Sequence, residues 1–394
     1  MSDSYRSYTL RTPSYHVAAA LPVSIYEPAV YSAVDSYAIN GHGFGFDSET
    51  HIKAIGEYLE RHVVFRAIQS TATGRICEMG LSEAEQSALV KAIQQTCERE
   101  DLKGEIVNHV FKLVDVRRLE TGERCSYPAV LVSLHGFSGC LDADFLPVRD
   151  TSGNAIHPDP ATAFRSALLE FVERQCTTAM WVSRRCNAIF PLGPSLVSHK
   201  KAAVICHQMA SRGTLMGYDI SFLDGASVIF GVYRSSVEGD QVNFACGCAA
   251  DFTEQSATLK AFTEVWQTSL LLPQMAFFGV RDYGSNKLKE DFWAANKPDF
   301  ELGVGVHALC IQGDANSRHS PEQKLLASLS QVSKNLYVFE KDIMISGVRM
   351  RFCRILSPDF FVHMSPGQGN NLENRWIHHF CKSGNRRVEP LPFS

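Results

Sequence analysis

Three segments of the sequence carry acidic side chains at helical spacing. In two of them a pair of glutamates three residues apart is followed at once by an arginine, and in the third a glutamine replaces the second glutamate. Side chains three residues apart lie on one face of a helix. Carboxylates suit Mg²⁺, which in proteins usually also binds phosphates. The pattern favours three acidic helices that converge and hold metal ions. The residues are Glu57, Glu60 and Arg61; Glu170, Glu173 and Arg174; and Glu264 and Gln267.

A second interpretation leaves these glutamates in solvent. A chain with 42 acidic residues contains some pairs at this spacing by chance, and glutamate is by default a surface residue. The three segments would then be ordinary amphipathic helices with charged rims. The spacing alone leaves both interpretations open.

Capping signals predict where the helices begin. Asp159 suits the N-cap of the central acidic helix and Pro160 its first position. We expect this helix over 160–175 and the first acidic helix over 49–68, with Ser48 as a cap. The third acidic helix should follow Thr253. Further helices are predicted at 81–100, 198–211 and 321–336.

Strands alternate with these helices along the chain, which predicts a mixed α/β (α+β) fold with sheets and packed helices. We expect one domain over 1–394. Its first 40 or so residues should be irregular, and a proline-spaced tail should begin at about residue 385. The predicted strands are 105–116, 129–134, 217–222, 226–233 and two within 337–356, and the first two are rich in β-branched and apolar residues.

Composition argues against several functional classes. The net charge of −4, without a basic stripe, does not indicate nucleic-acid binding. The apolar run 269–280 is too short to span a bilayer, so no membrane association is expected. The 12 cysteines show no zinc-type CxxC spacing, and we interpret them as reduced thiols of a cytoplasmic protein. The sequence has no P-loop or kinase signature, so a bound nucleotide would need an unconventional site.

Taken together, the two ExxER helices, the ExxQ helix and the proline-spaced C-terminus resemble the YcaO family. The similarity covers nearly the whole chain after about residue 40. Within the family, three segments resemble the cyclodehydratase subunits of microcin synthetases, which make azole-containing peptide antibiotics. These segments are Gly56–Arg61, Arg149–Gly153 and Ser357–Met364.

This resemblance implies an enzyme that uses ATP and Mg²⁺ to phosphorylate a peptide amide oxygen and then closes a thiazoline or oxazoline ring on Cys, Ser or Thr. Arg174 would contact nucleotide phosphate and act in catalysis. Glu57, Glu60, Glu170 and Glu173 would bind Mg²⁺. The residues expected at the nucleotide site as a whole are Glu57, Glu60, Arg61, Glu170, Glu173, Arg174, Glu264 and Gln267.

The loop before the central helix departs from the family pattern. Many members have Ser, Asn and a carboxylate there, in the order SxxNxxxE, whereas this sequence has Ala155, Pro158 and Thr162. After a local shift, other polar side chains of the loop would have to supply the nucleotide contacts. The candidates are Ser152, Asn154, His157 and Asp159.

The resemblance also implies partners. Subunits of this kind work on a precursor peptide with an E1-like leader-binding subunit and an FMN-dependent azoline dehydrogenase. Two alternatives remain open: a thioamide- or amidine-forming YcaO enzyme, and a YcaO scaffold without catalytic activity. The intact acidic pairs and Arg174 argue against the scaffold.

The chain ends Pro390-Leu-Pro-Phe-Ser394, which is PxPxP spacing with serine in the last place. Alternating prolines favour an extended tail. The family resemblance implies that the C-terminal carboxylate of Ser394 reaches the substrate amide as a base. A frayed terminus is the alternative.

Overall fold

The computed structural model describes most of the chain between residues 50 and 391. The described residues are 7–8, 14–19, 29–34, 40–44, 50–134, 140–278, 296, 302–304, 310–311, 319–345, 347–367, 369–381, 386–389 and 391.

Ten α-helices are present in the described part of the chain. Asp159 caps α5 by accepting a hydrogen bond from the Thr162 N–H, and Pro160 occupies the first turn, as predicted. A π-helical turn, η1, follows α1. The helices are α1 (Thr50–His62), η1 (Val63–Ala67), α2 (Glu83–Thr96), α3 (Glu100–Lys103), α4 (Asp142–Phe145), α5 (Pro160–Ser183), α6 (Leu192–Ser195), α7 (Lys200–Ala210), α8 (Glu254–Phe278), α10 (Pro321–Val332) and α11 (Arg375–His378), with 3₁₀ turns η2 (Ile76–Glu78) and η3 (Ala129–Leu131).

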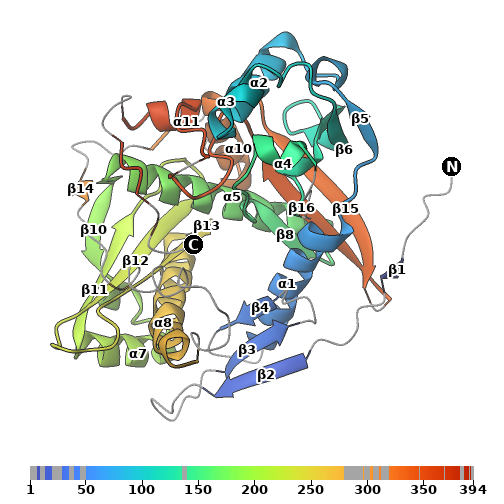
Figure 1. Cartoon of the computed structure of the whole chain (residues 1–394). Helices are drawn as coiled ribbons and strands as arrows, with labels where there is room; N and C mark the ends of the chain where they lie inside the picture. The colour runs from blue at the N-terminus through green and yellow to red at the C-terminus, as the bar shows by residue number, and fades with distance from the viewer. Residues whose placement is uncertain are drawn as a thin grey trace.

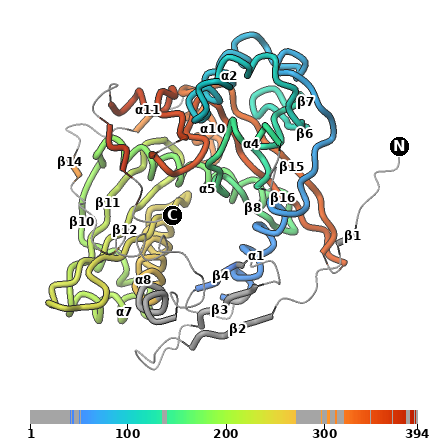
Figure 2. Tube along the Cα trace, viewed as in Figure 1, coloured from blue at the N-terminus to red at the C-terminus, as the bar shows by residue number. Residues whose placement is uncertain are grey.

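The largest sheet has seven strands in the order β5-β6-β15-β16-β8, with β7 on β6 and β1 on β15. The antiparallel hairpin β15–β16, late in the chain, lies beside β6 and β7 from its first third (Figure 2). The strands are β1 (Ser7–Tyr8), β5 (Ala72–Gly74), β6 (Phe111–Arg118), β7 (Arg124–Pro128), β8 (Asn154–His157), β15 (Tyr337–Ile345) and β16 (Val348–Leu356).

A second, four-stranded antiparallel sheet has the order β10-β11-β12-β13, so β13 is an edge strand. Two smaller sheets complete the described structure. The first is β2-β3-β4, against which α1 packs through β3 and β4, and the second pairs β9 with β14. The strands are β2 (Ser14–Ala19), β3 (Ala29–Val34), β4 (Asn40–Gly43), β9 (Arg185–Cys186), β10 (Ala188–Pro191), β11 (Gly213–Asp219), β12 (Ser227–Ser235), β13 (Phe244–Asp251) and β14 (Gly303–Val304).

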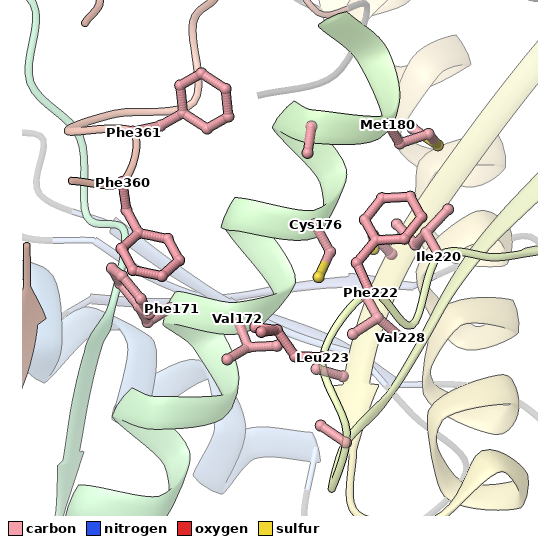
Figure 3. Close-up of a cluster of buried hydrophobic side chains, with 14 of the residues drawn as sticks. Phe171, Val172, Cys176, Met180, Ile220, Phe222, Leu223, Val228, Phe360 and Phe361 are labelled. Atoms are coloured by element: carbon pink, nitrogen blue, oxygen red, sulfur yellow. The ribbon is translucent and has the colours of Figure 1, made fainter. Parts of the chain in front are cut away.

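Helix α5 joins the two large sheets. It lies between them in Figure 1 and packs on β8 and β16 on one side and on β13 on the other. Figure 3 shows Phe171 of α5 against Phe360, with ring centroids 5.3 Å apart, while Cys176 and Met180 face Phe222 and its neighbours. Burial on both sides fixes the rotation of α5, and therefore the direction in which its acidic face points.

The structure corrects three predictions. The N-terminal 40 residues are not wholly irregular, because β2 pairs with β3. The strand predicted over 105–116 begins only at Phe111, after a turn. The strand predicted over 129–134 is a buried 3₁₀ turn, because the N–H groups of Val132 and Ser133 bond back to Ala129 O at 3.0 and 2.8 Å. The residues of this turn are apolar because they are buried, and a buried strand has the same composition.

Candidate active site

In two of the predicted acidic helices, an arginine lies one helical turn after the first glutamate of the pair. On α1, Arg61 Nη2 lies 2.5 Å from Glu57 Oε1. On α5, Arg174 Nε donates to Glu170 Oε1 at 2.8 Å and lies 4.0 Å from Glu173 Oε1. Each arginine therefore holds the first glutamate of its pair and leaves the second with fewer counter-ions.

The edge strand β13 binds the other two acids through its backbone. Ala250 N–H donates to Glu173 Oε2, and Cys248 N–H donates to Glu264 Oε2, both at 3.1 Å. Because β13 is the last strand of its sheet, outward N–H groups on it need partners from outside the sheet. The carboxylates of α5 and α8 supply these partners.

Helix α8 approaches strand β13 closely at Gly247, and this makes the hydrogen bond to Glu264 possible. A Cβ atom on Gly247 would lie 2.4 Å from Glu264 Cβ and 2.6 Å from Val265 N. Only glycine lets α8 lie this close to β13, and the closeness brings the Glu264 carboxylate to the strand edge.

The charges show that the three helices converge. Burial raises the pKa of Glu60 to about 8, and Glu170 of α5 and Glu57 add to the effect. Burial, then Glu170 and then Glu264 of α8, raise the pKa of Glu173 well above its usual range. The acidic faces of α1, α5 and α8 therefore lie near enough to influence one another, whereas a nucleotide site between them stays a prediction. We call Glu57, Glu60, Glu170, Glu173 and Glu264 the acidic cluster.

Two further groups of the site have perturbed pKa values. The Glu264 side chain keeps an exposed edge, yet the protein crowded around its carboxylate raises its pKa to about 7, against the opposing effects of Arg174 and the Cys248 N–H. Burial by itself lowers the pKa of Arg174, but Glu170 and Glu173 more than offset this, so the guanidinium stays charged. Gln267 lies on α8, three residues after Glu264, and is half-buried.

The acidic cluster fits Mg²⁺ with phosphates more closely than it fits an all-protein metal cage. In the part of the chain that is described, no three His, Cys, Asp or Glu side chains are placed to hold one ion. Mg²⁺ in proteins is typically held by one or two carboxylates plus substrate phosphates. The donor set that such an ion would complete is two pairs of neighbouring carboxylates, in which Glu60 and Glu173 have raised pKa values.

Sequence reasoning missed the contacts of Asp150 and Arg354. Asp150 Oδ1 accepts from Ser152 N–H at 2.9 Å, and Oδ2 accepts from Met364 N–H at 2.7 Å. Met364 Sδ in turn contacts Arg174 Nη1. Arg354 is 3% exposed, and burial lowers its pKa to about 10 while Asp150 and then Glu60 oppose the effect. The available signal was an arginine within the apolar second half of the strand, 352–356.

The loop before α5 uses two of its four polar candidates for its own structure. Asp159 caps the helix, and His157 Nδ1 accepts from Asp159 N–H at 2.9 Å. Ser152 and Asn154 remain, both buried. Gly153 between them has φ +75°, and a Cβ there would lie 2.8 Å from Ile355 O, so this turn requires glycine.

The tail is anchored on the last turns of α5. Trp181 Nε1 donates to Glu389 O at 2.8 Å, and the Arg387 guanidinium lies 3.7 Å from the centroid of the Trp181 ring. Leu391 is buried in the same core as α5. Ser394, predicted to be catalytic through its carboxylate, lies outside the described residues.

Comparisons with known proteins identify the family of the chain. Residues 40–360 match the family described as YcaO cyclodehydratase, ATP- and Mg²⁺-binding. The chain therefore belongs to the YcaO family.

Individual relatives are consistent with this assignment. The chain is 25% identical over 333 residues to the microcin B17-processing protein McbD of Escherichia coli, covering 82% of this chain and 83% of McbD. It is similar in fold to a chain of the E. coli microcin synthetase McbBCD complex, with a TM-score of 0.83, 23% identity and full coverage of both chains. It also resembles YcaO from Methanopyrus kandleri bound with AMPPCP and Mg²⁺, with a TM-score of 0.54, 17% identity and coverage of 88% and 85%.

Among the described helices, none combines the length and the apolar character that crossing a membrane would require.

Proposed function

We propose that this protein is an ATP-dependent peptide cyclodehydratase that converts Cys, Ser or Thr of a ribosomally made precursor peptide to thiazoline or oxazoline. The observation that carries the proposal is the acidic cluster. Helices from three distant parts of a YcaO-family chain bring together carboxylates with raised pKa values around Arg174.

The chemistry requires an amide oxygen to leave. The Cys, Ser or Thr side chain adds to the preceding carbonyl carbon and loses its S–H or O–H proton to a base. The former amide oxygen then attacks the γ-phosphorus of ATP, so that ADP leaves. Inorganic phosphate then departs from carbon as the amide nitrogen loses its proton and the C=N bond forms. The balance is one ATP consumed, with ADP, phosphate and one azoline ring produced. None of the protein's own cysteines has to act as a nucleophile.

The residues divide this work. Glu57, Glu60, Glu170 and Glu173 would hold Mg²⁺, which neutralises the phosphates of ATP when bound. Arg174, held by Glu170, would stabilise charge on the transferred phosphoryl group. Arg61, Glu264 and Gln267 would line the nucleotide site.

The anchored tail supports a role for Ser394. Trp181 is eight residues beyond Glu173, about 12 Å along the helix axis. Glu389 is hydrogen-bonded to Trp181, and the five residues that follow it, 390–394, can span at most about 17 Å, which exceeds this distance. The terminal carboxylate would therefore have the reach to act as a base near the acidic cluster, and this rests on the contacts of Trp181 with residues 387 and 389.

We also propose that the protein works in the cytoplasm as a subunit of a synthetase that makes an azole-containing peptide antibiotic. The support is the similarity to McbD and the solved E. coli complex of McbBCD with pro-MccB17 bound. The partners would be the precursor peptide, an E1-like leader-binding subunit and an FMN-dependent dehydrogenase that oxidises azoline to azole. By itself, the chain should be nearly inactive on the precursor.

The test is a reconstitution with the cognate precursor. The expected result is phosphate release together with the loss of one water per ring, both dependent on the partner subunits. A peptide without Cys, Ser or Thr at the modified positions should abolish both. Exchange of an amide oxygen for sulfur would indicate a thioamide-forming enzyme. Water loss that requires a free peptide amine would indicate an amidine-forming enzyme. The absence of phosphate release would indicate a scaffold.

A further inference from the structure

The guanidinium of Arg174 is held at two of its three nitrogens. Its Nε donates to Glu170 Oε1 at 2.8 Å, and its Nη1 donates to the thioether sulfur of Met364. In the part of the chain that the structure describes, no group accepts a hydrogen bond from Nη2. A guanidinium is a rigid planar group, so two fixed nitrogens set its plane, whereas one would leave it able to turn. The third nitrogen is therefore presented in a defined direction.

Methionine is an unusual partner for this arginine. A thioether is a weak and uncharged acceptor. Glu170 and Glu173 already supply negative charge near the guanidinium and keep its pKa high against the effect of burial. A further carboxylate in the place of Met364 would compete with an anionic ligand for the same N–H groups. The sulfur instead holds the direction of the guanidinium and leaves its charge available.

The backbone around Met364 is fixed on the helix that carries Arg174. A methionine side chain is flexible, so its sulfur stays in one place only if the surrounding structure holds it. Gln175, which follows Arg174 in α5, accepts from the Phe361 N–H at 2.8 Å and donates to Phe361 O at 2.9 Å. Asp150 Oδ2 accepts from the Met364 N–H at 2.7 Å. Phe361 lies beside α5 (Figure 3), and Met364 is buried in the same core, so the loop and the helix form one unit.

Two buried asparagines, Asn370 and Asn371, brace the same loop. Asn370 Nδ2 donates to the carbonyl oxygens on either side of Met364, those of His363 and Ser365, at 2.9 and 2.7 Å. The Asn371 side chain makes three further hydrogen bonds to the backbone of the loop. These side chains satisfy backbone groups that regular secondary structure would otherwise pair. The position of Met364 is therefore set by the fold.

We propose that Met364 is a positioning residue for phosphoryl transfer: its sulfur holds Nη1 of Arg174, so that Nη2 meets the transferred phosphoryl group. Glu170 and Met364 fix the guanidinium before substrate binds, and fixed donors stabilise the charge that develops in a reaction better than mobile ones. The proposal rests on the proposed function, because it needs Arg174 to act on a phosphoryl group. It adds a residue that lies 190 positions after Arg174 in the sequence.

Two substitutions separate the sulfur acceptor from the packing of the side chain. Met364→Leu keeps an apolar side chain, an exchange that buried sites tolerate, and removes the acceptor. Met364→Gln packs less well but restores an acceptor, its amide oxygen. The matched control is Met180→Leu, because Met180 is a fully buried methionine of α5 in the same core.

Three properties of each full-length variant are measured. They are the melting temperature, the kcat and KM of precursor-dependent phosphate release with the partner subunits, and the NMR signals of isotope-labelled arginine side chains in the free chain. Arg174→Lys identifies the signals of Arg174. A fixed guanidinium gives separate signals for its two Nη groups, and a turning one gives an averaged signal.

Met364→Leu should melt close to the wild type, yet its kcat should fall about tenfold while its KM for the precursor stays unchanged. The Nη signals of Arg174 should be averaged in this variant. Met364→Gln should melt lower, yet it should recover most of the lost kcat and the separate Nη signals. Met180→Leu should match the wild type throughout. A purely structural role of Met364 would instead make activity follow the melting temperature.

Wild-type kcat and separate Nη signals in Met364→Leu would overturn the proposal, because the sulfur would then only fill space. The proposal is also wrong if Met364→Gln is as inactive as Met364→Leu, since the loss would then follow side-chain shape. If Met364→Gln fails to fold, the comparison of Met364→Leu with Met180→Leu decides. A wild-type complex that releases no phosphate refutes the proposed function instead, and the NMR signals of the free chain still show whether Met364 holds Arg174.

Discussion

Glu173→Gln separates charge from hydrogen bonding inside the acidic cluster. A glutamine oxygen can still accept from Ala250 N–H, as Glu173 Oε2 does at 3.1 Å. Burial and the nearby carboxylates raise the pKa of Glu173, so its ionised form costs folding stability as the pH rises above the usual carboxyl range. Glutamine copies the neutral form. The variant should therefore be at least as stable as the wild type at neutral pH.

The effect on activity should have the opposite sign. Two unit charges at 4 Å interact by about 4 kcal/mol at an effective dielectric constant of 20, and a divalent ion doubles this to about 8 kcal/mol. Desolvation of the carboxylate and compensation by its neighbours reduce that gross figure. We expect kcat/KM for ring formation to fall at least about 100-fold, which corresponds to about 2.7 kcal/mol.

The assay measures phosphate release with partners and precursor present, over a Mg²⁺ titration, next to thermal unfolding of the isolated chain. Glu254→Gln, on the exposed first turn of α8, makes the same chemical change outside the acidic cluster and should leave both measurements unchanged. Wild-type turnover in Glu173→Gln would remove Glu173 from the metal site. A strongly destabilised Glu173→Gln protein would contradict the raised pKa.

Three further perturbations have defined outcomes. Gly247→Ala should cost about 1–3 kcal/mol of folding stability by forcing α8 away from β13, whereas Gly56→Ala, with open space around its Cβ, should stabilise α1 by about 0.5–1 kcal/mol in chemical denaturation. Glu85 has its pKa lowered to about 2, mainly by Arg118, against the effect of burial. Glu85 therefore contributes folding stability above its unfolded pKa, and this contribution disappears as the pH falls towards 2. The variant Glu85→Gln should lose up to about 3 kcal/mol of folding stability at pH 7. Glu83→Gln, at an exposed position, should lose almost none. A C-terminal tag should abolish ring formation but not ATP binding, whereas Ser394→Pro should be tolerated; normal ring formation by the tagged enzyme would exclude a catalytic tail.

The parts of the site that could be predicted from sequence depend on local rules. Glu170 and Glu173 share a helix face because of their spacing, and Asp159 with Pro160 marks where that helix begins. The repeated pattern favoured convergence of the three helices, although the spacing alone left solvent-exposed glutamates open as well. The mistaken strand at 129–134 followed from the same kind of reasoning, because a buried apolar run has one composition whether it is a strand or a turn.

The remaining parts depend on pairings that no local pattern contains. The Ala250 and Cys248 N–H groups bind carboxylates because β13 is an edge strand, and strand order is set by the whole chain. Arg354 meets Asn154 because β16 pairs with β8 in one register. If one of these strands shifted by one residue, a side chain on the opposite face would take its place beside the partner.

The backbone contacts also explain how like charges can be held together in the free protein. Neighbouring glutamates repel, and arginines are paired to Glu57 and Glu170 but only loosely to Glu173. Hydrogen bonds from β13 fix Glu173 and Glu264 in place without neutralising them. The cost of this arrangement appears as the raised pKa values of Glu60, Glu173 and Glu264. A divalent cation would turn that repulsion into attraction, and charged groups fixed in place before the reaction are how proteins obtain large electrostatic effects.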